Sequence, residues 1–383
     1  MLAVIPLLAL LSLTHSPVAS PSQETFEEIA SQADKAREGD RLTDAIALYS
    51  EGVRLHPSWV DGWWWLSSLL YEQDRFSEAQ APLKRFIAIA PKPAPAYAFL
   101  ALCEYETHDY DAALRHFQEW GRRGSPGNDA LIDVAGFHWA LLLTRNGRFV
   151  QALYLLAAKA HKLGPSPELI EALGLASLRM PYLPEDYPPE RRELVWLAGK
   201  AAGFLSTNSV SQADEYARAM QLHYDKEPYV HFFRGTLFSF QKDWASAADE
   251  YQRELQLWPK CGPALVELAF ARIENLEAAE ALAPAERAVT LLPEDARARY
   301  VLGAALLEAG RFQESADQLE VARHLAPDSA RIRFSLANAY KRLGRAEDAK
   351  RERAVFQTLK NREDAAAEHP QEETASPQQM EHP

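Results

Sequence analysis

The stretch DGWWWLSSLLYEQDRFSEAQAPLKRFIAIAP, residues 61–91, contains the pattern on which the fold depends. In residues 61–73, and again in residues 76–91, apolar side chains recur at intervals of three and four, which is the periodicity of an amphipathic α-helix. A short polar turn, residues 73–75, separates the two halves. Pro91 closes the second half because proline cannot continue a helix. The segment therefore predicts two helices joined by a tight turn.

This helix pair repeats along the chain with a period of about 34 residues. One small residue stands at the same place in each unit, and the series is Ala33, Ser67, Ala101, Ala140, Gly174, Ala201, Gly235, Ala269, Gly303 and Ala337. Seven of the nine steps in this series equal the period. A small residue where two helices cross lets their backbones approach closely. Prolines 259, 293 and 327 recur at the same interval, so independent markers predict a repeat protein.

The pattern resembles that of the tetratricopeptide repeat family, in which W-x-x-L-G-x-x-Y precedes A-x-x-x-F and a proline. In one unit the matching residues are Trp63, Leu66, Ser67, Leu70, Ala79, Leu83 and Pro91. His231, Arg234 and Lys200 depart from the apolar character of the family at their positions. The resemblance covers residues 24–360 and implies an all-α, right-handed solenoid of stacked antiparallel helix pairs. It also implies a scaffold that binds proteins or peptides, without indicating a particular pathway.

The repeat divides the solenoid into nine regular units and one irregular unit. The regular units are expected near residues 26–59, 60–93, 94–127, 133–166, 194–227, 228–261, 262–295, 296–329 and 330–360. In the irregular unit, residues 167–193, a helix without a partner is followed by a loop with four prolines. Two interpretations remain open. The unit is either a decayed repeat that lost its second helix, or a loop that serves a function as a bend or a partner-binding element.

The two ends of the chain have a different composition from the repeats. Residues 2–13 are apolar and small residues follow them, which is typical of a secretory signal peptide, here residues 1–22. The apolar run is too short to span a bilayer, which takes roughly 20 residues. We therefore expect an extracytoplasmic protein, either periplasmic or secreted. Residues 361–383 are rich in Glu, Pro and Gln and predict a disordered tail.

Composition and missing motifs exclude several classes of function. The net charge of −13 is unfavourable for binding nucleic acid, which needs clustered Lys and Arg. No HExxH, G-x-x-x-x-G-K-[ST], G-x-S-x-G or C-x-x-C motif occurs, so we expect no enzyme, metal or cofactor. The cluster HDYDAALRH, residues 108–116, matches no standard metal-ligand spacing. Cys103 and Cys261 lie several units apart and are expected to be unpaired.

The three adjacent tryptophans predict three different environments, since successive helical residues are rotated by about 100°. We expect Trp63 in the core, Trp64 on the concave groove and Trp65 against the preceding unit. Equivalent and neighbouring groove positions are often aromatic, and the candidate groove residues are Trp64, Tyr71, Tyr105, Phe137, Phe232, Phe240, Phe270, Tyr300 and Phe334. Such a row would suit an apolar or extended peptide. The alternative is that a tightly wound superhelix packs these rings against its own neighbours.

These expectations combine into one functional hypothesis. The chain is expected to be an exported, non-enzymatic scaffold that binds protein or peptide partners through its groove. An alternative class is an accessory factor for envelope assembly or polysaccharide export, in which the repeats organise membrane machinery. For the binding surface we expect Trp64, Phe232 and Phe334 to be partly exposed.

Overall fold

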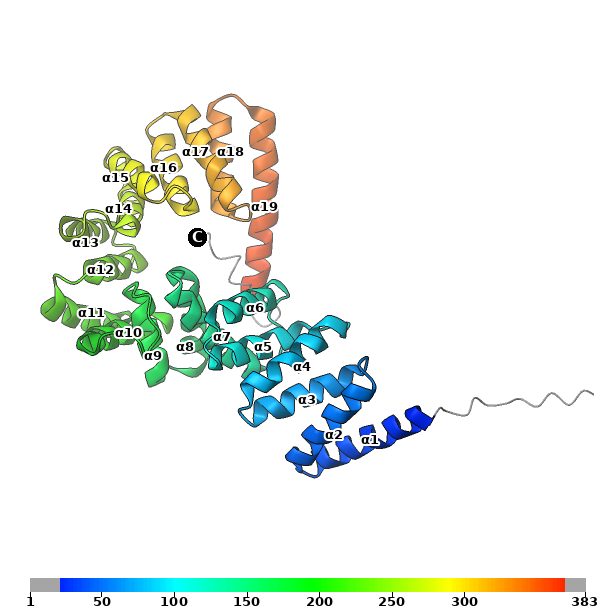
Figure 1. The fold of residues 1–383 in the computed structure, drawn as a ribbon. Helices are drawn as coiled ribbons and strands as arrows, with labels where there is room; N and C mark the ends of the chain where they lie inside the picture. Colours follow the sequence, from blue (N-terminus) through cyan, green and yellow to red (C-terminus); the bar gives the residue numbers. More distant parts are fainter. Residues whose placement is uncertain (1–20, 369–383) are drawn as a thin grey trace, which may run out of the picture. The chain divides into compact units, whose positions relative to one another are not determined.

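The computed structural model describes residues 21–368, and these residues are almost entirely helical (Figure 1). They contain nineteen α-helices and one short 3-10 helix, and no strand occurs among them. The expected all-α fold of stacked helix pairs is therefore confirmed. The predicted signal peptide falls outside the described residues except for its last two positions, and residues 369–383 of the predicted tail also lie outside them.

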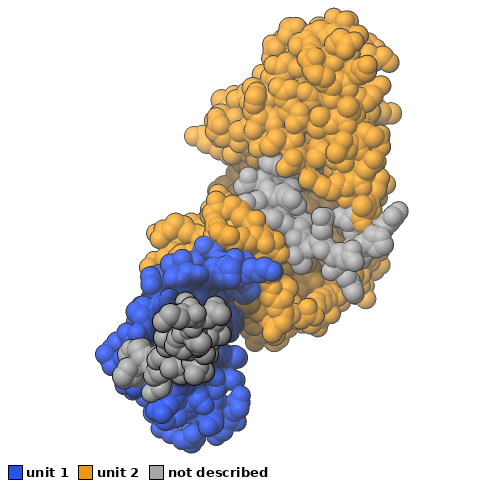
Figure 2. Space-filling view, turned by 90° about the vertical axis from the view of Figure 1, so that its right-hand side faces the viewer, with its two compact units in different colours: residues 1–108 blue, residues 109–383 orange. Residues whose placement is uncertain are grey.

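The chain divides into two compact units, residues 1–108 and 109–383 (Figure 2). In unit 1 the helices are α1 (Pro21–Glu38), α2 (Leu42–Leu55), α3 (Val60–Glu72), α4 (Phe76–Ile89) and α5 (Ala94–Glu106). Unit 2 begins with α6 (Tyr110–Arg122), α7 (Asp129–Arg145), α8 (Phe149–Leu163), α9 (Pro167–Ser177), η1 (Pro189–Arg191), α10 (Arg192–Ser206) and α11 (Val210–Tyr224). It continues with α12 (Val230–Phe240), α13 (Trp244–Leu257), α14 (Gly262–Glu274), α15 (Ala278–Leu291), α16 (Ala296–Glu308), α17 (Phe312–Leu325), α18 (Ala330–Arg342) and α19 (Ala346–Glu368).

One backbone conformation joins the two helices of every regular pair. Two residues before the second helix, φ is positive at Asp40, Asp74, His108, Gly147, Asn208, Lys242, Leu276, Gly310 and Gly344. Gly and Asn adopt this left-handed conformation readily, but Lys242 and Leu276 do not. The packing of the pair therefore imposes the turn even where the local sequence disfavours it.

The tryptophans of unit 1 are partly buried and pack against its core. Trp59 fills the space left by Gly52 and Gly62, where a Cβ atom would overlap its ring. Trp63 is half-buried and its Nε1 donates a hydrogen bond to the Pro57 carbonyl at 3.0 Å. The Arg37 guanidinium lies 4.0 Å from the centre of the Trp65 ring, so Trp65 faces the preceding helix pair as expected.

Helix α9 has no second helix and packs against α10 instead. Their backbones cross at Gly174 and Gly199, where an added methyl group would overlap the carbonyl oxygens of Val195 and Ile170, respectively. The proline-rich loop takes the place of the missing helix. Its Leu183 is fully buried, and the hydroxyl of Tyr187 donates a hydrogen bond to Glu171 at 2.5 Å. The degenerate unit expected near residues 167–193 is confirmed.

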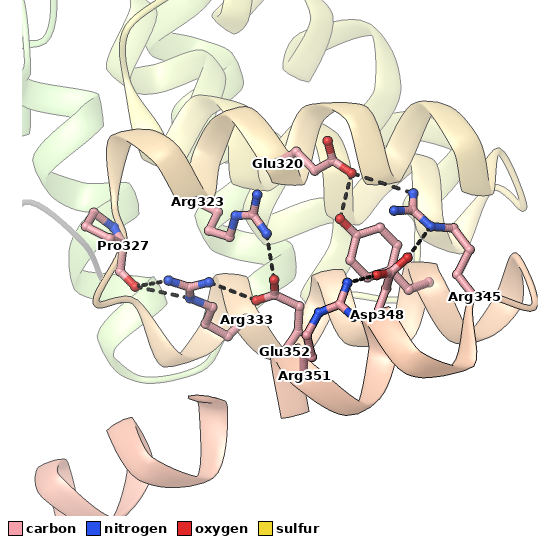
Figure 3. A network of polar contacts seen from close by, with 9 residues as sticks. Glu320, Arg323, Pro327, Arg333, Arg345, Asp348, Arg351 and Glu352 are labelled. Atoms are coloured by element: carbon pink, nitrogen blue, oxygen red, sulfur yellow. Dashed lines mark hydrogen bonds and ion pairs between the residues drawn. The ribbon is translucent and has the colours of Figure 1, made fainter. Parts of the chain in front are cut away.

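The last three helices are joined by a network of ion pairs (Figure 3). Glu352 of α19 is buried and accepts hydrogen bonds from Arg323 of α17 at 2.6 Å and from Arg333 of α18 at 2.9 Å. Beside it, the hydroxyl of Tyr340 donates to Glu320 at 2.6 Å. Burial, followed by this bond, raises the pKa of Tyr340 to about 12. α19 extends to Glu368, so its last turns lie in the segment that the sequence assigns to the tail.

The α9–α10 crossing yields a stability prediction. Gly199→Ala should lower the free energy of unfolding by about 2 kcal/mol or more, because the new methyl group meets backbone that cannot rotate away. Gly203→Ala in the same helix is the matched control, since its Cβ would lie 3.5 Å from its nearest neighbour. That variant should be neutral or up to about 1 kcal/mol more stable. Urea denaturation of both variants measures the difference, and equal effects would contradict the close crossing.

Candidate partner-binding groove

Two of the candidate aromatic residues of unit 1, Trp64 and Tyr71, pack on other rings of the same unit. The rings of Trp64 and Tyr71 lie 5.5 Å and 5.2 Å from the ring of Phe99, measured between centres, and both meet it edge to face. Trp64 also lies 5.1 Å from Phe86. Burial raises the pKa of the Tyr71 hydroxyl. Trp64 is half-buried, as expected, and so is Tyr105. In unit 1 the row therefore contributes to the core as well as to the surface.

The candidate residues of unit 2 differ widely in exposure. Phe232 and Tyr300 are each only 9% exposed, whereas Phe334 is 44% exposed and Phe240 is 52% exposed. Phe137 and Phe270 are half-buried. The expected exposure is thus confirmed for Phe334 and wrong for Phe232. Phe232 is covered because the rings of Tyr229 and Tyr251 pack on it, with centres 5.9 Å and 5.7 Å away.

The residue that covers Phe232 from a third side is Arg179, in the turn after α9. Its guanidinium carbon lies 5.1 Å from the centre of the Phe232 ring, 5.7 Å from Phe149 and 5.9 Å from Tyr229. Arg179 has a positive φ of 50°, which an ordinary helical residue would not adopt. Its side chain forms no ion pair and no hydrogen bond with the other described residues, 21–368. Burial lowers the pKa of its guanidinium, which nevertheless stays charged at neutral pH.

A second arginine and an aromatic ring lie beside this cluster. Arg297 donates from Nε and Nη2 to the two carboxylate oxygens of Glu267, each at 2.8 Å. Burial lowers the pKa of the Arg297 guanidinium, but the Glu267 carboxylate raises it by more, so the pKa is raised. The Phe270 ring centre lies 4.9 Å from Arg297 and 5.6 Å from Arg331. Arginines and rings therefore alternate from α9 to α18.

Arg179, Phe149 and Arg297 border a cleft of about 390 Å³ in unit 2. Its lining consists of residues 147–151 at the start of α8, Arg179, residues 294–297 at the start of α16, and Leu325. Three of the lining residues are arginines, namely Arg148, Arg179 and Arg297. Asp295, which also lines the cleft, accepts a hydrogen bond from the Ala298 amide at 2.6 Å and so caps α16. The cleft thus presents three guanidinium groups, the ring of Phe149 and the carboxylates of Glu294 and Asp295 on walls built by distant helices.

The family is indicated by sequence profiles. Two profiles described as tetratricopeptide repeat match the chain, one over residues 31–94 and 69–129 and the other over residues 306–352. These parts of the chain are tetratricopeptide repeats. No curated protein matches it in sequence.

Solved structures with some likeness to this tetratricopeptide repeat chain have low similarity scores. MamA residues 41–end from Desulfovibrio magneticus RS-1 is 20% identical over 44% of this chain and 95% of that chain, with a TM-score of 0.40. YrrB, titled a TPR protein with an unusual peptide-binding site, is 18% identical over 44% of this chain and 88% of that chain, with a TM-score of 0.38.

Buried polar residues of α12 and α13 form hydrogen bonds next to the rings around Arg179. Glu254 of α13 is buried and accepts hydrogen bonds from the amides of Tyr229 at 2.8 Å and Phe232 at 3.1 Å. His231 places Nδ1 2.7 Å from Glu250, and this contact raises the pKa of the imidazole. Burial raises the pKa of Glu254. The carboxylates of α13 therefore fix the start of α12, which carries two of the rings around Arg179.

Sequence reasoning missed the groove arginines and Phe149. Arg297 and Arg331 are one repeat period apart, at the repeat position of Tyr229, so the period that located the aromatic row could also have located them. Arg179 has no such signal, because it lies where the period is interrupted. Its position depends on how α9 packs.

Three further features of the described residues concern metal ions, membrane spans and cysteines. Within residues 21–368 no group of three or more His, Cys, Asp or Glu side chains could hold a metal ion. In the same residues no helix is both long and apolar enough to cross a membrane. Cys103 and Cys261 are buried and free, which confirms that they are unpaired.

The uneven exposure of the aromatic row predicts uneven effects on stability. Phe232→Ala should lower the free energy of unfolding by about 3 kcal/mol or more, because the ring is buried among Tyr229, Tyr251 and Arg179. Phe240→Ala, at 52% exposure in the same helix, should cost less than about 1 kcal/mol. Guanidinium denaturation measures both values. A small loss for Phe232→Ala would show that Phe232 belongs to an open surface.

Proposed function

We propose that the chain is an exported, non-enzymatic scaffold that binds protein partners, and that an extended partner segment enters the groove of unit 2. The proposal is carried by one observation: the Arg179 cation is held against three rings at the border of a cleft, and its side chain forms no ion pair or hydrogen bond with the described residues. A poorly hydrated cation without an anion is unfavourable. A polar or acidic group from a partner would complete its environment.

Exposed rings along the same helices supply contact area for such a segment. Phe334 is 44% exposed on α18, and Phe270 is half-buried on α14 between two arginines. Aromatic and arginine side chains dominate the binding energy of protein interfaces because they are large and lose little entropy on binding. The combination supports a surface for a protein partner better than a surface for a small molecule or a nucleic acid.

Export and the lack of catalysis belong to the same proposal. Residues 1–22 have the composition of a signal peptide, and the sequence lacks the common catalytic motifs. N-terminal sequencing of the protein recovered outside the cytoplasm tests export directly. Recovery of the uncleaved chain from the cytoplasm alone would refute that part of the proposal.

Site-specific photo-crosslinking in cells tests the groove. A benzophenone amino acid in place of Phe334 should form adducts with a partner protein, whereas the same probe in place of Leu222, which is 78% exposed on α11, should not. Adding Arg179→Met should weaken the interaction behind the Phe334 adduct by about tenfold, or about 1.4 kcal/mol. Equal adducts from both positions, or none from position 334, would refute groove binding. Identification of the adduct also separates a soluble partner from envelope or polysaccharide-export machinery, the alternative class.

A further inference from the structure

We propose that the acidic C-terminal segment of this chain, residues 372–381, binds in the cleft around Arg179 when no partner occupies the groove. This inference deepens the proposed function and rests on it for the role of the groove. Its test, however, needs no external partner. The segment would act as an internal competitor that a partner must displace.

The first argument is that two groove arginines have no ion pair or side-chain hydrogen bond with the described residues. Arg179 and Arg331 form no ion pair with described residues, while Arg297 between them is neutralised by Glu267 through two hydrogen bonds. Glu294 and Asp295 also line the cleft, and the negative charges of Asp295 and Glu267 act on Arg179 without forming an ion pair with it. The groove therefore offers two guanidinium groups to which carboxylates can be added.

The second argument is charge complementarity within the chain. Residues 369–383, HPQEETASPQQMEHP, contain Glu372, Glu373 and Glu381 and neither Lys nor Arg. The whole chain has a net charge of −13, so most of its surface repels such a segment and a cationic groove is distinctive. Met380 precedes Glu381, and a thioether packs favourably on aromatic rings. The segment thus carries both kinds of group that the cleft borders favour.

The third argument is tethering. α19 belongs to unit 2, which also contains the cleft, and it ends at Glu368, four residues before Glu372. In Figure 1, α19 extends from the α17–α18 end of unit 2 in the direction of α6 and α7. Fifteen further residues can span up to roughly 50 Å when extended. A tether of this length gives an effective concentration on the order of millimolar, so a contact of modest affinity is populated.

Solution NMR of the full-length chain, labelled with ¹⁵N, tests the inference. If the segment is bound, the amide signals of Thr374, Ala375, Ser376, Gln378 and Gln379 should be broadened, because the segment tumbles with a 43.0 kDa protein. They should sharpen in the triple variant Glu372→Gln/Glu373→Gln/Glu381→Gln, which leaves the cleft intact, and also in Arg179→Met. Arg218→Met, which removes an exposed arginine paired with Asp214, is the matched control and should leave the signals broad. Sharp signals in the unmodified chain would overturn the inference.

A second measurement tests the inference without the Arg179→Met variant, which could misfold. A labelled peptide of residues 369–383 should bind in trans to a chain that ends at Glu368, and the peptide with three Glu→Gln changes should bind at least about tenfold more weakly. Equal binding of the two peptides would overturn the proposed role of the carboxylates. The two experiments can fail separately. If a foreign protein forms photo-adducts at position 334 but the segment does not bind, only this inference is refuted. Segment binding without foreign adducts would refute only the scaffold function.

Discussion

The structure depends on one constraint: a pair of helices cannot cover its own apolar faces, so each pair must pack closely enough to be covered by the next. The small residue of each unit meets this requirement. At Gly235 an added Cβ would lie 2.6 Å from the Tyr251 ring, and at Gly303 it would lie 2.6 Å from Leu319, so the second helix projects a large side chain into the space. Ala33, Ala101 and Ala269 occupy the same place and are fully buried. Small residues recur once per period in the sequence because each helix pair needs this close packing.

The irregular unit meets the same constraint in another way. Without a second helix in its unit, the small residue Gly174 receives no side chain from such a helix and lies instead against the backbone of α10, opposite Gly199. The step from Gly174 to the next marker, Ala201, is shorter than the period because a loop, and not a second helix, connects α9 to α10. The chain must then leave α9 in a turn of its own, and this turn brings Arg179 against Phe232. The same departure that breaks the repeat thus places Arg179 at the candidate site.

Much of the fold could be predicted because the period is a direct consequence of packing. Helix pairs and the unpaired α9 follow from spacing alone, and even the left-handed turn residues fall at a constant offset. The environment of single groove residues could not be predicted in the same way. Phe232 and Phe334 occupy the same repeat position, yet one is buried and the other is exposed. The difference arises from Arg179 and Tyr229, and Arg179 comes from a segment outside the period.

The choice of arginine matters for how the groove would bind. A guanidinium group can stack on aromatic rings and still present its N–H donors to an anion, whereas the ammonium group of lysine is a more strongly hydrated point charge. Phe149, Tyr229 and Phe232 hold the Arg179 guanidinium in place, and Glu254 holds the backbone of the latter two. The cation is therefore oriented before any anion arrives. Because side-chain ordering is a major cost of association, a preformed cation lowers that cost for whichever acidic segment enters, whether it belongs to a partner or to this chain.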